Sequence, residues 1–86
     1  MSVYNRTKAD SRKQERADRT AEIAAIDSGS WPRDIDDRHR WGVGQTFYSN
    51  ADHAAYARQQ CVSVIDYLDG IPARIASGEL GNGWQA

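Results

Sequence analysis

The 86-residue chain contains little cysteine, which could form disulfides, and little proline, which interrupts helices: one Cys and two Pro. It also contains only one phenylalanine. A single cysteine excludes an internal disulfide, and the position of Cys61 within a helical apolar pattern predicts a reduced, structural thiol. No apolar run is long enough to span a bilayer. The basic N-terminus is not followed by a hydrophobic segment, as a secretory signal would be. These absences favour a soluble, cytoplasmic protein with no membrane partner.

Large aliphatic side chains are also scarce. Hydrophobic residues make up 40% of the chain, but many of them are alanines. We therefore expect one small domain over residues 1–86, with a thin core that three Trp, four Tyr and one Phe help to fill. A core of this size gains from self-association or from docking onto a larger protein.

The most regular pattern lies between residues 49 and 70. Ser49 and Asp52 have the spacing of a helix capping box. Apolar residues then recur at helical spacing along one face, namely Ala54, Ala57, Cys61, Val64, Ile65 and Leu68. Gly70 suits the left-handed residue that ends a helix, and Pro72 cannot continue one. These signals predict a central helix over residues 50–69.

The flanking segments predict less regular structure. We expect a first helix over residues 6–27, in which residues 1–15 fray or project because they have no apolar stripe. Ile23 and Ile26 are expected to face the core. A short third helix is predicted over residues 72–77, beginning at Pro72, followed by a flexible tail over residues 79–86.

The stretch between the two main helices is rich in tryptophan, glycine and arginine. Pro32 disfavours helix at Trp31, and residues 34–40 fit a loop or one or two helical turns. We expect an irregular connection that covers the open side of the helix pair. The predicted fold class is thus mostly α: two main helices, a short third helix and a Trp-rich irregular connection.

One acidic cluster invites a metal-site interpretation. Asp34, Asp36, Asp37 and His39 lie within six residues, but a calcium loop needs oxygen ligands at alternate positions, a central Gly and a final Glu. Here Arg38 and His39 occupy two of the required positions. His39, His53 and Cys61 have no paired spacing for zinc. The pattern is more typical of a solvated acidic loop neutralised by neighbouring arginines, with no metal.

Catalysis finds little support in the residue pattern. Cys61 lies eight residues after His53, which is too far along a helix for a nucleophile to contact its base. Gly42 and Gly44 lack the third glycine and the strand–helix context of a phosphate-binding loop. We therefore expect a protein that is not an enzyme and that has no cofactor and no small-molecule substrate.

The connection does contain the residue types that dominate protein interfaces. The candidate protein-binding residues are Trp31, Arg33, Arg38, Arg40, Trp41 and Tyr48. The tryptophans fit a core role equally well, and both interpretations stay open. The sequence thus favours a non-catalytic protein-interaction module, an adaptor, inhibitor or assembly subunit that binds a larger protein or itself through this segment and the first helix. Its small size would suit an accessory protein of a mobile element.

Charge distribution supports one alternative. Residues 1–20 contain six Lys and Arg against three Asp and Glu, whereas the remainder contains five Arg against nine Asp and Glu. A helix would align four of the N-terminal cations in one stripe, namely Lys8, Arg12, Arg16 and Arg19. Such a stripe can follow a phosphate backbone, although Glu15, Asp18 and Glu22 would form an acidic stripe on the neighbouring face. A small nucleic-acid-binding or regulatory protein is therefore the alternative prediction.

Overall fold

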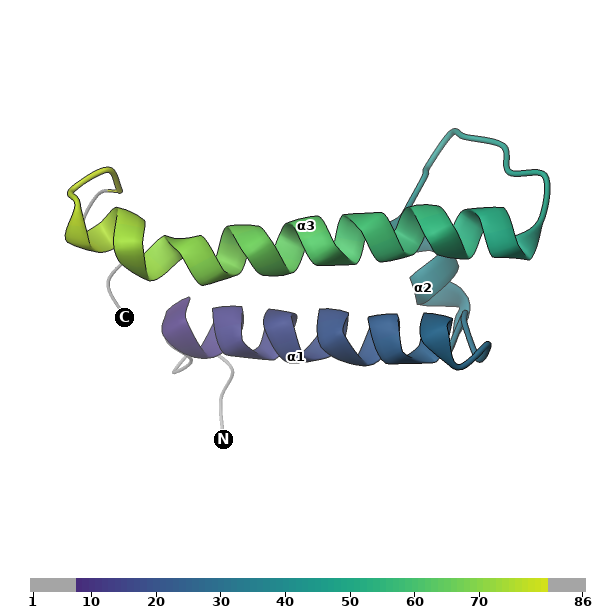
Figure 1. Ribbon diagram of the computed structural model, residues 1–86, viewed down its shortest axis with the longest axis horizontal. Helices are drawn as coiled ribbons and strands as arrows, with labels where there is room; N and C mark the ends of the chain where they lie inside the picture. Colours follow the sequence, from purple (N-terminus) through teal and green to yellow (C-terminus); the bar gives the residue numbers. More distant parts are fainter. Residues whose placement is uncertain (1–7, 81–86) are drawn as a thin grey trace.

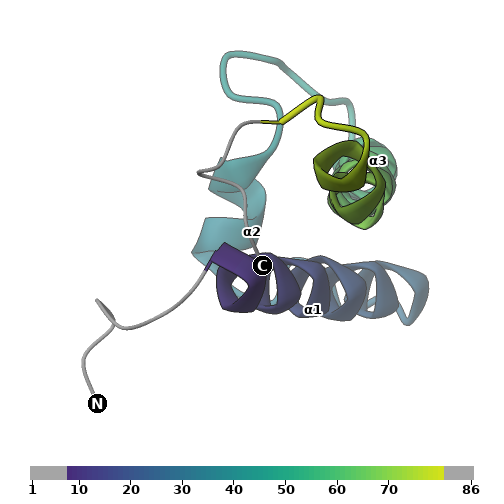
Figure 2. The ribbon, with the colours of Figure 1, turned by 90° about the vertical axis from the view of Figure 1, so that its left-hand side faces the viewer.

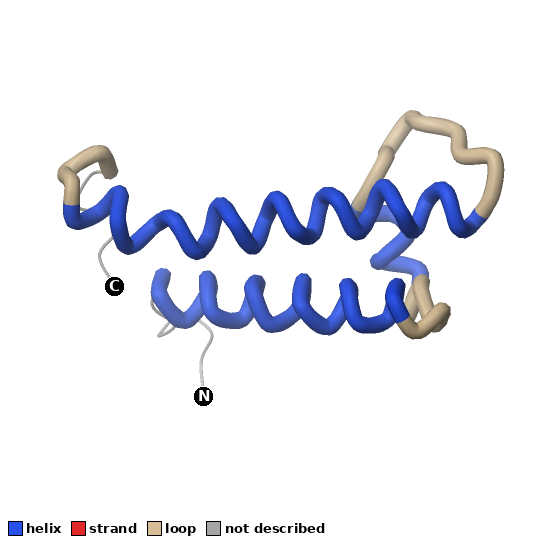
Figure 3. The backbone as a smooth tube through the Cα atoms, in the orientation of Figure 1, coloured by secondary structure: helices blue, strands red, loops and turns tan. Residues whose placement is uncertain are grey.

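The computed structural model describes residues 8–80. It contains three helices: α1 (Lys8–Asp27), α2 (Ile35–Arg40) and α3 (Asn50–Ala76). Figure 1 shows α1 and α3 side by side and antiparallel, and Figure 2 shows α2 on one side of this pair. No strand occurs among residues 8–80, and the connections at 28–34 and 41–49 are irregular (Figure 3). The mostly α fold class is confirmed.

Helix α1 ends where the sequence predicted, at Asp27. Gly29 adopts a left-handed φ of 79°, and the backbone N–H of Ser30 returns to the carbonyl of Ala25 at 2.8 Å, which satisfies a carbonyl of the last turn. Residues 8–15 are helical, whereas the expected start at residue 6 and the fraying of residues 1–7 lie outside the described residues. Ile26 packs against the core, as expected for its side of the helix.

Helix α3 begins at its predicted cap, where the Ser49 hydroxyl accepts the backbone N–H of Asp52 at 3.1 Å. The predicted end at Asp69 and the separate helix at residues 72–77 are both wrong, because α3 continues through Gly70 and Pro72 to Ala76. Ile71 explains the continuation: it is fully buried on the apolar face of the helix. Burial of such a side chain is worth about 1.5–3 kcal/mol, which offsets the hydrogen bond that the proline removes.

One arginine side chain adds a hydrogen bond to the helix backbone near Pro72. The guanidinium of Arg74 donates to the backbone carbonyl of Tyr67 at 3.0 Å, one turn before the proline. The helix ends at Ala76, and Gly78 just beyond it has a φ of 81° and donates its N–H to the carbonyl of Ile75. Glu79 and Leu80 follow without helical structure, and the remainder of the predicted tail, residues 81–86, lies outside the described part of the chain.

Helix α2 is the element that the sequence left undecided. Asp34 caps it, because its carboxylate accepts the backbone N–H groups of Asp36 and Asp37 at 3.0 and 3.2 Å. The Trp31–Pro32 peptide bond before it is cis. The short third helix of this fold therefore lies in the Trp-rich connection rather than after Pro72.

The apolar core is thin and lies where α1, α3 and the connection meet. Its buried cluster consists of Ala25, Trp31 and Ala57, against which Ile26, Trp41 and Ala54 pack. Cys61 is free and fully buried on the same face of α3. Within residues 8–80, no helix combines the length and the apolar character that crossing a membrane requires.

Two glycines in the 41–49 loop provide a matched test of its packing. Gly42 and Gly44 both have positive φ angles, 74° and 82°, so alanine strains the backbone at either position. A Cβ at Gly42 would also lie 2.6 Å from the Phe47 ring, whereas a Cβ at Gly44 meets nothing within 4 Å. We expect Gly44→Ala to lower the free energy of unfolding by about 1 kcal/mol and Gly42→Ala by about 2 kcal/mol. Urea denaturation measures both, and equal losses would show that Phe47 does not hold the loop.

Candidate functional site

Glu22 of α1 lies at the centre of a buried polar cluster. Its side chain is fully buried. One carboxylate oxygen, Oε2, accepts the indole N–H of Trp31 at 2.9 Å and that of Trp41 at 2.8 Å. These two tryptophans flank α2 in the sequence, one before it and one after it. A single buried carboxylate thus ties both ends of the α2 segment to α1.

The other oxygen of Glu22 faces three guanidinium groups. Oε1 lies 3.4 Å from Arg40 Nη1, 3.6 Å from Arg19 Nε and 3.9 Å from Arg33 Nη2. Arg19 is itself buried, and its second carboxylate partner is Glu15 at 3.5 Å. A buried carboxylate is costly unless it is both paired and hydrogen-bonded, and Glu22 meets both conditions.

Asp37 of α2 forms the second buried carboxylate. Arg33 binds it with two parallel N–H donors at 2.8 and 2.7 Å, and the backbone N–H of Arg33 adds a third bond at 2.9 Å. Arg40 donates to it at 3.0 Å. These bonds, above all those from the Arg33 side chain, hold the pKa of Asp37 well below its usual range. Arg40 therefore bridges Asp37 and Glu22.

We refer to these residues together as the Glu22–Asp37 cluster: Arg19, Glu22, Trp31, Arg33, Asp37, Arg40 and Trp41. The cluster fixes the connection and α2 against α1 by directional bonds where the chain offers few aliphatic side chains. Cys61 adjoins it, and burial, followed by the charge of Glu22, raises the pKa of its thiol to about 12. The thiol is therefore protonated at neutral pH and is not an activated nucleophile.

The loop that leaves the cluster, residues 41–49, is anchored on its inner side. The Phe47 ring stacks on that of His53, with centroids 4.2 Å apart and planes 8° from parallel. His53 Nε2 lies 2.9 Å from the carbonyl oxygen of Trp41, and the Gln45 side-chain amide donates to the Tyr56 hydroxyl at 3.3 Å. The backbone of the loop is therefore held against the first turns of α3.

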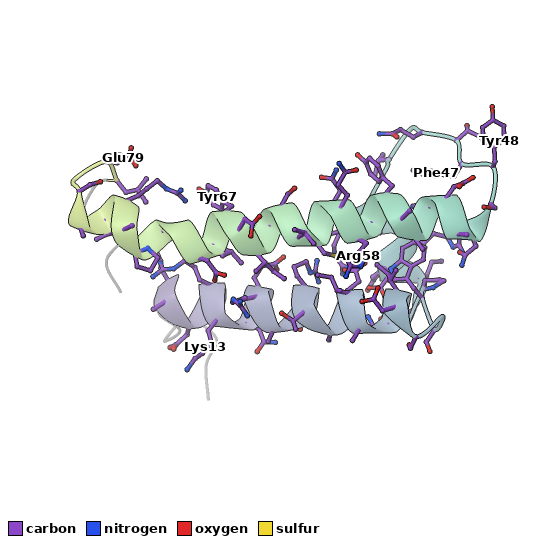
Figure 4. All side chains as sticks on the ribbon, in the orientation of Figure 1. Lys13, Phe47, Tyr48, Arg58, Tyr67 and Glu79 are labelled. Carbon is purple, nitrogen blue, oxygen red and sulfur yellow. The ribbon has the colours of Figure 1, made fainter. Side chains whose placement is uncertain are left out.

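The same loop exposes two large apolar side chains to solvent. Val43 is 84% exposed, and Tyr48 is fully exposed. In Figure 4, Tyr48 points away from the body of the protein at the end of α3 where Phe47 is labelled. Beneath the loop lies an open hollow of about 390 Å³, lined by residues 41–45 together with Arg38, His39 and His53.

The six candidate protein-binding residues have different environments. Trp31 is buried and belongs to the core, and Arg33 and Arg40 are engaged by Asp37 and Glu22. Trp41 is half-buried. Arg38 lies over the Trp31 ring, 5.7 Å from its centroid, and bonds to Asn50. Tyr48 is thus the most accessible member of the set.

Sequence reasoning missed three residues that matter here. It placed Glu22 only on an acidic stripe of the first helix, and it did not identify Glu22 as buried. It placed Asp37 in a solvated loop, which is wrong because the side chain is buried, although arginines neutralise it as expected. No local signal separates Glu22 from the other acidic residues of α1. Val43 was not among the candidate binding residues, although its side chain is 84% exposed.

The four cations of the N-terminal stripe do not form one exposed surface. Lys8 and Arg16 are exposed, Arg12 is half-buried and Arg19 is buried. Arg16 also pairs with Asp69 of α3 at 2.7 Å. The stripe therefore lies on a helix as predicted, but its four charges are unequally accessible because Arg19 is buried in the cluster and Arg16 pairs with α3. Binding of nucleic acid by this stripe stays a prediction.

The acidic residues of the α2 segment are not gathered around a common point. Asp34 is occupied as the helix cap and Asp37 by arginines. Among residues 8–80, no group of three His, Cys, Asp or Glu side chains could hold a metal ion. Comparisons with known protein families, with curated proteins and with solved structures found no match to this chain.

Proposed function

We propose that this chain is a non-catalytic protein-interaction module that binds a larger protein through the 41–49 loop. One observation carries the proposal: an anchored loop presents Val43 and Tyr48 to solvent almost completely. Large exposed apolar side chains on an ordered loop are typical of binding surfaces. Tyrosine in particular is enriched among the residues that dominate binding energy.

The anchoring supports a recognition role for the loop. Phe47 stacks on His53 and Gln45 bonds to Tyr56, so the loop loses little conformational entropy when a partner covers it. The Glu22–Asp37 cluster lies directly below and fixes Trp41, the first residue of the loop, to α1. A preorganised surface of this kind on a small scaffold supports a role as an adaptor or inhibitor.

Affinity capture followed by quantitative mass spectrometry tests the proposal. The immobilised baits are the wild-type chain, a loop variant carrying Val43→Ser and Tyr48→Ser, and a control carrying Tyr67→Ser. Tyr67 is about half exposed on α3, so the control removes a comparable aromatic surface elsewhere. We expect a protein that the wild type and the control retain and the loop variant loses. Equal recovery on all three baits would contradict the proposal.

Tyr48 is expected to dominate the interaction. We expect Tyr48→Ala to weaken binding of the captured partner by about 2 kcal/mol, or roughly 30-fold in Kd. Thermal stability should hardly change, because the Tyr48 side chain is fully exposed. Isothermal titration calorimetry measures the Kd, with Tyr67→Ala as the matched control. An unchanged Kd for Tyr48→Ala would remove this residue from the proposed surface.

A further inference from the structure

Helices α1 and α3 carry the same four-position pattern. Each helix has an arginine, then a β-branched residue four positions later, an isoleucine at seven and an aspartate at eleven. The residues are Arg16, Thr20, Ile23 and Asp27 on α1, and Arg58, Val62, Ile65 and Asp69 on α3. Positions spaced by 4, 7 and 11 residues follow one stripe along a helix. We call these eight residues the paired strip.

The two stripes meet across the seam between the helices. Because α1 and α3 are antiparallel (Figure 1), the arginine of each helix faces the aspartate of the other. Arg16 Nε lies 2.7 Å from Asp69 Oδ1, and Arg58 Nε lies 2.8 Å from Asp27 Oδ1. All four charged side chains remain about half exposed, so a further protein surface can still reach them.

Three of the four middle residues of the paired strip are apolar, and the fourth, Thr20, donates its hydroxyl to the carbonyl of Arg16 at 2.8 Å. Val62 is 39% exposed, and Ile23 and Ile65 are half-buried. Arg58 lies two residues after Tyr56, which contacts the loop residue Phe47, and two residues turn a helix by about 200°. The strip therefore lies on the side of α3 away from the loop, and Figure 4 labels Arg58 between α1 and α3. No other described helix covers that side of the pair (Figure 2).

We propose that the paired strip binds the paired strip of a second copy of this chain, forming a two-fold symmetric dimer. The charge pattern selects this occupant. If the two-fold axis runs along the helices, α1 faces the α3 of the second copy, and Arg16 faces its Asp69. If the axis runs across the helices, α1 faces α1, and Arg16 faces Asp27 of the other copy. Either two-fold arrangement places arginine opposite aspartate at every charged position.

The dimer also completes the packing of the helix pair. Two antiparallel pairs stacked face to face form a four-helix arrangement, in which apolar residues of facing helices share one core. Val62, Ile23 and Ile65 would lie at its centre, with the charged positions around them. A symmetric interface uses the same patch twice, so a change at Val62 is introduced twice at the centre of the contact.

Sedimentation equilibrium over micromolar to millimolar concentrations tests the proposal. We expect the wild-type chain to dimerise and Val62→Glu to raise the dimer Kd at least about tenfold. Val43→Glu is the matched control: it adds the same charge at a more exposed valine on the loop and should leave the Kd unchanged. A wild type that stays monomeric throughout, or a Val62→Glu variant that dimerises like the wild type, would overturn the proposal.

A second variant tests the charge pattern without touching the apolar centre. Asp27→Lys combined with Asp69→Lys makes every charged position of the paired strip cationic, so both two-fold arrangements become repulsive. We expect a monomer whose far-ultraviolet circular dichroism matches that of the wild type, because exposed ion pairs contribute little to folding. A folded variant that retains the wild-type dimer Kd would exclude the paired strip as the interface.

The proposals of a paired-strip dimer and of a partner-binding loop can be contradicted independently of each other. Val43→Glu should abolish partner capture and leave dimerisation intact. Val62→Glu should weaken dimerisation and leave partner capture intact. Loss of partner binding in both variants would mean that the partner recognises the dimer through the loop of each copy.

Discussion

Replacement of Glu22 by alanine is expected to lower the free energy of unfolding by about 3–5 kcal/mol, the cost of removing one partner from a buried charge pair. The indole N–H groups of Trp31 and Trp41 both lose their acceptor. Arg19, which is buried, keeps Glu15 at 3.5 Å as its carboxylate partner. This loss is a large fraction of the stability of about 5–15 kcal/mol that is typical of native proteins, so Glu22→Ala should unfold at a much lower urea concentration than the wild type.

Urea denaturation followed by tryptophan fluorescence measures this effect, since two of the three tryptophans report directly on the cluster. Glu15→Ala is the matched control. Glu15 also pairs with Arg19, but its side chain is 45% exposed, and its removal should change stability little. Similar losses for Glu15→Ala and Glu22→Ala would show that the burial of Glu22 has no energetic consequence.

A double-mutant cycle isolates the Glu22–Arg19 pair. Glu22→Leu leaves Arg19 buried beside two unpaired indoles, and Arg19→Leu leaves Glu22 with fewer compensating charges. The double variant removes both buried charges, so its loss should be smaller than the sum of the two single losses. Additive losses would mean that the two side chains act independently.

Replacement of Asp37 by asparagine is expected to lower the free energy of unfolding by about 3 kcal/mol at neutral pH. Asparagine has the shape of aspartate but brings an N–H₂ group toward the donors of Arg33 and Arg40. The backbone N–H of Arg33 also loses its charged acceptor. The connection before α2 should loosen first, because Arg33 holds it to the helix.

The same carboxylate should govern acid unfolding. The pKa of Asp37 is lower in the folded protein than the value of about 3.9 in an unfolded chain. The unfolded state therefore takes up a proton first as the pH falls. The contribution of Asp37 is complete above about pH 5 and is lost progressively below about pH 4.

Stability measured by urea titration between pH 7 and pH 2 checks this expectation. The wild type should lose stability steeply at the acid end, and Asp37→Asn should have a flatter profile there. Asp69→Asn is the control: Arg16 also lowers the pKa of Asp69, but this exposed carboxyl should change the profile little. Parallel profiles for the wild type and Asp37→Asn would refute the assignment.

The sequence by itself determined the features that depend on neighbours within one or two turns. The Ser49 cap, the end of α1 at Asp27 and the apolar face of α3 around Ala57 and Cys61 follow from capping groups and helical spacing. These signals act over a few residues, so a linear pattern contains them. The mostly α class followed from the same information.

Where a local signal competed with burial, the tertiary structure decided. Gly70 and Pro72 carry genuine stop signals, yet α3 continues because Ile71 becomes fully buried. The free energy that this burial contributes depends on which residues pack over Ile71, and the sequence pattern of the helix does not contain that information. The end of the central helix was therefore mispredicted for a physical reason.

Glu22 shows most clearly what only the tertiary structure determines. Glu15, Asp18 and Glu22 are acidic residues on the same helix, and nothing local distinguishes them. Glu22 becomes the centre of the buried polar cluster because Trp31, Trp41 and three arginines contact its carboxylate. The paired strip arises in the same way: the sequence contains both stripes, but only the antiparallel packing of α1 on α3 brings each arginine to the aspartate of the other helix.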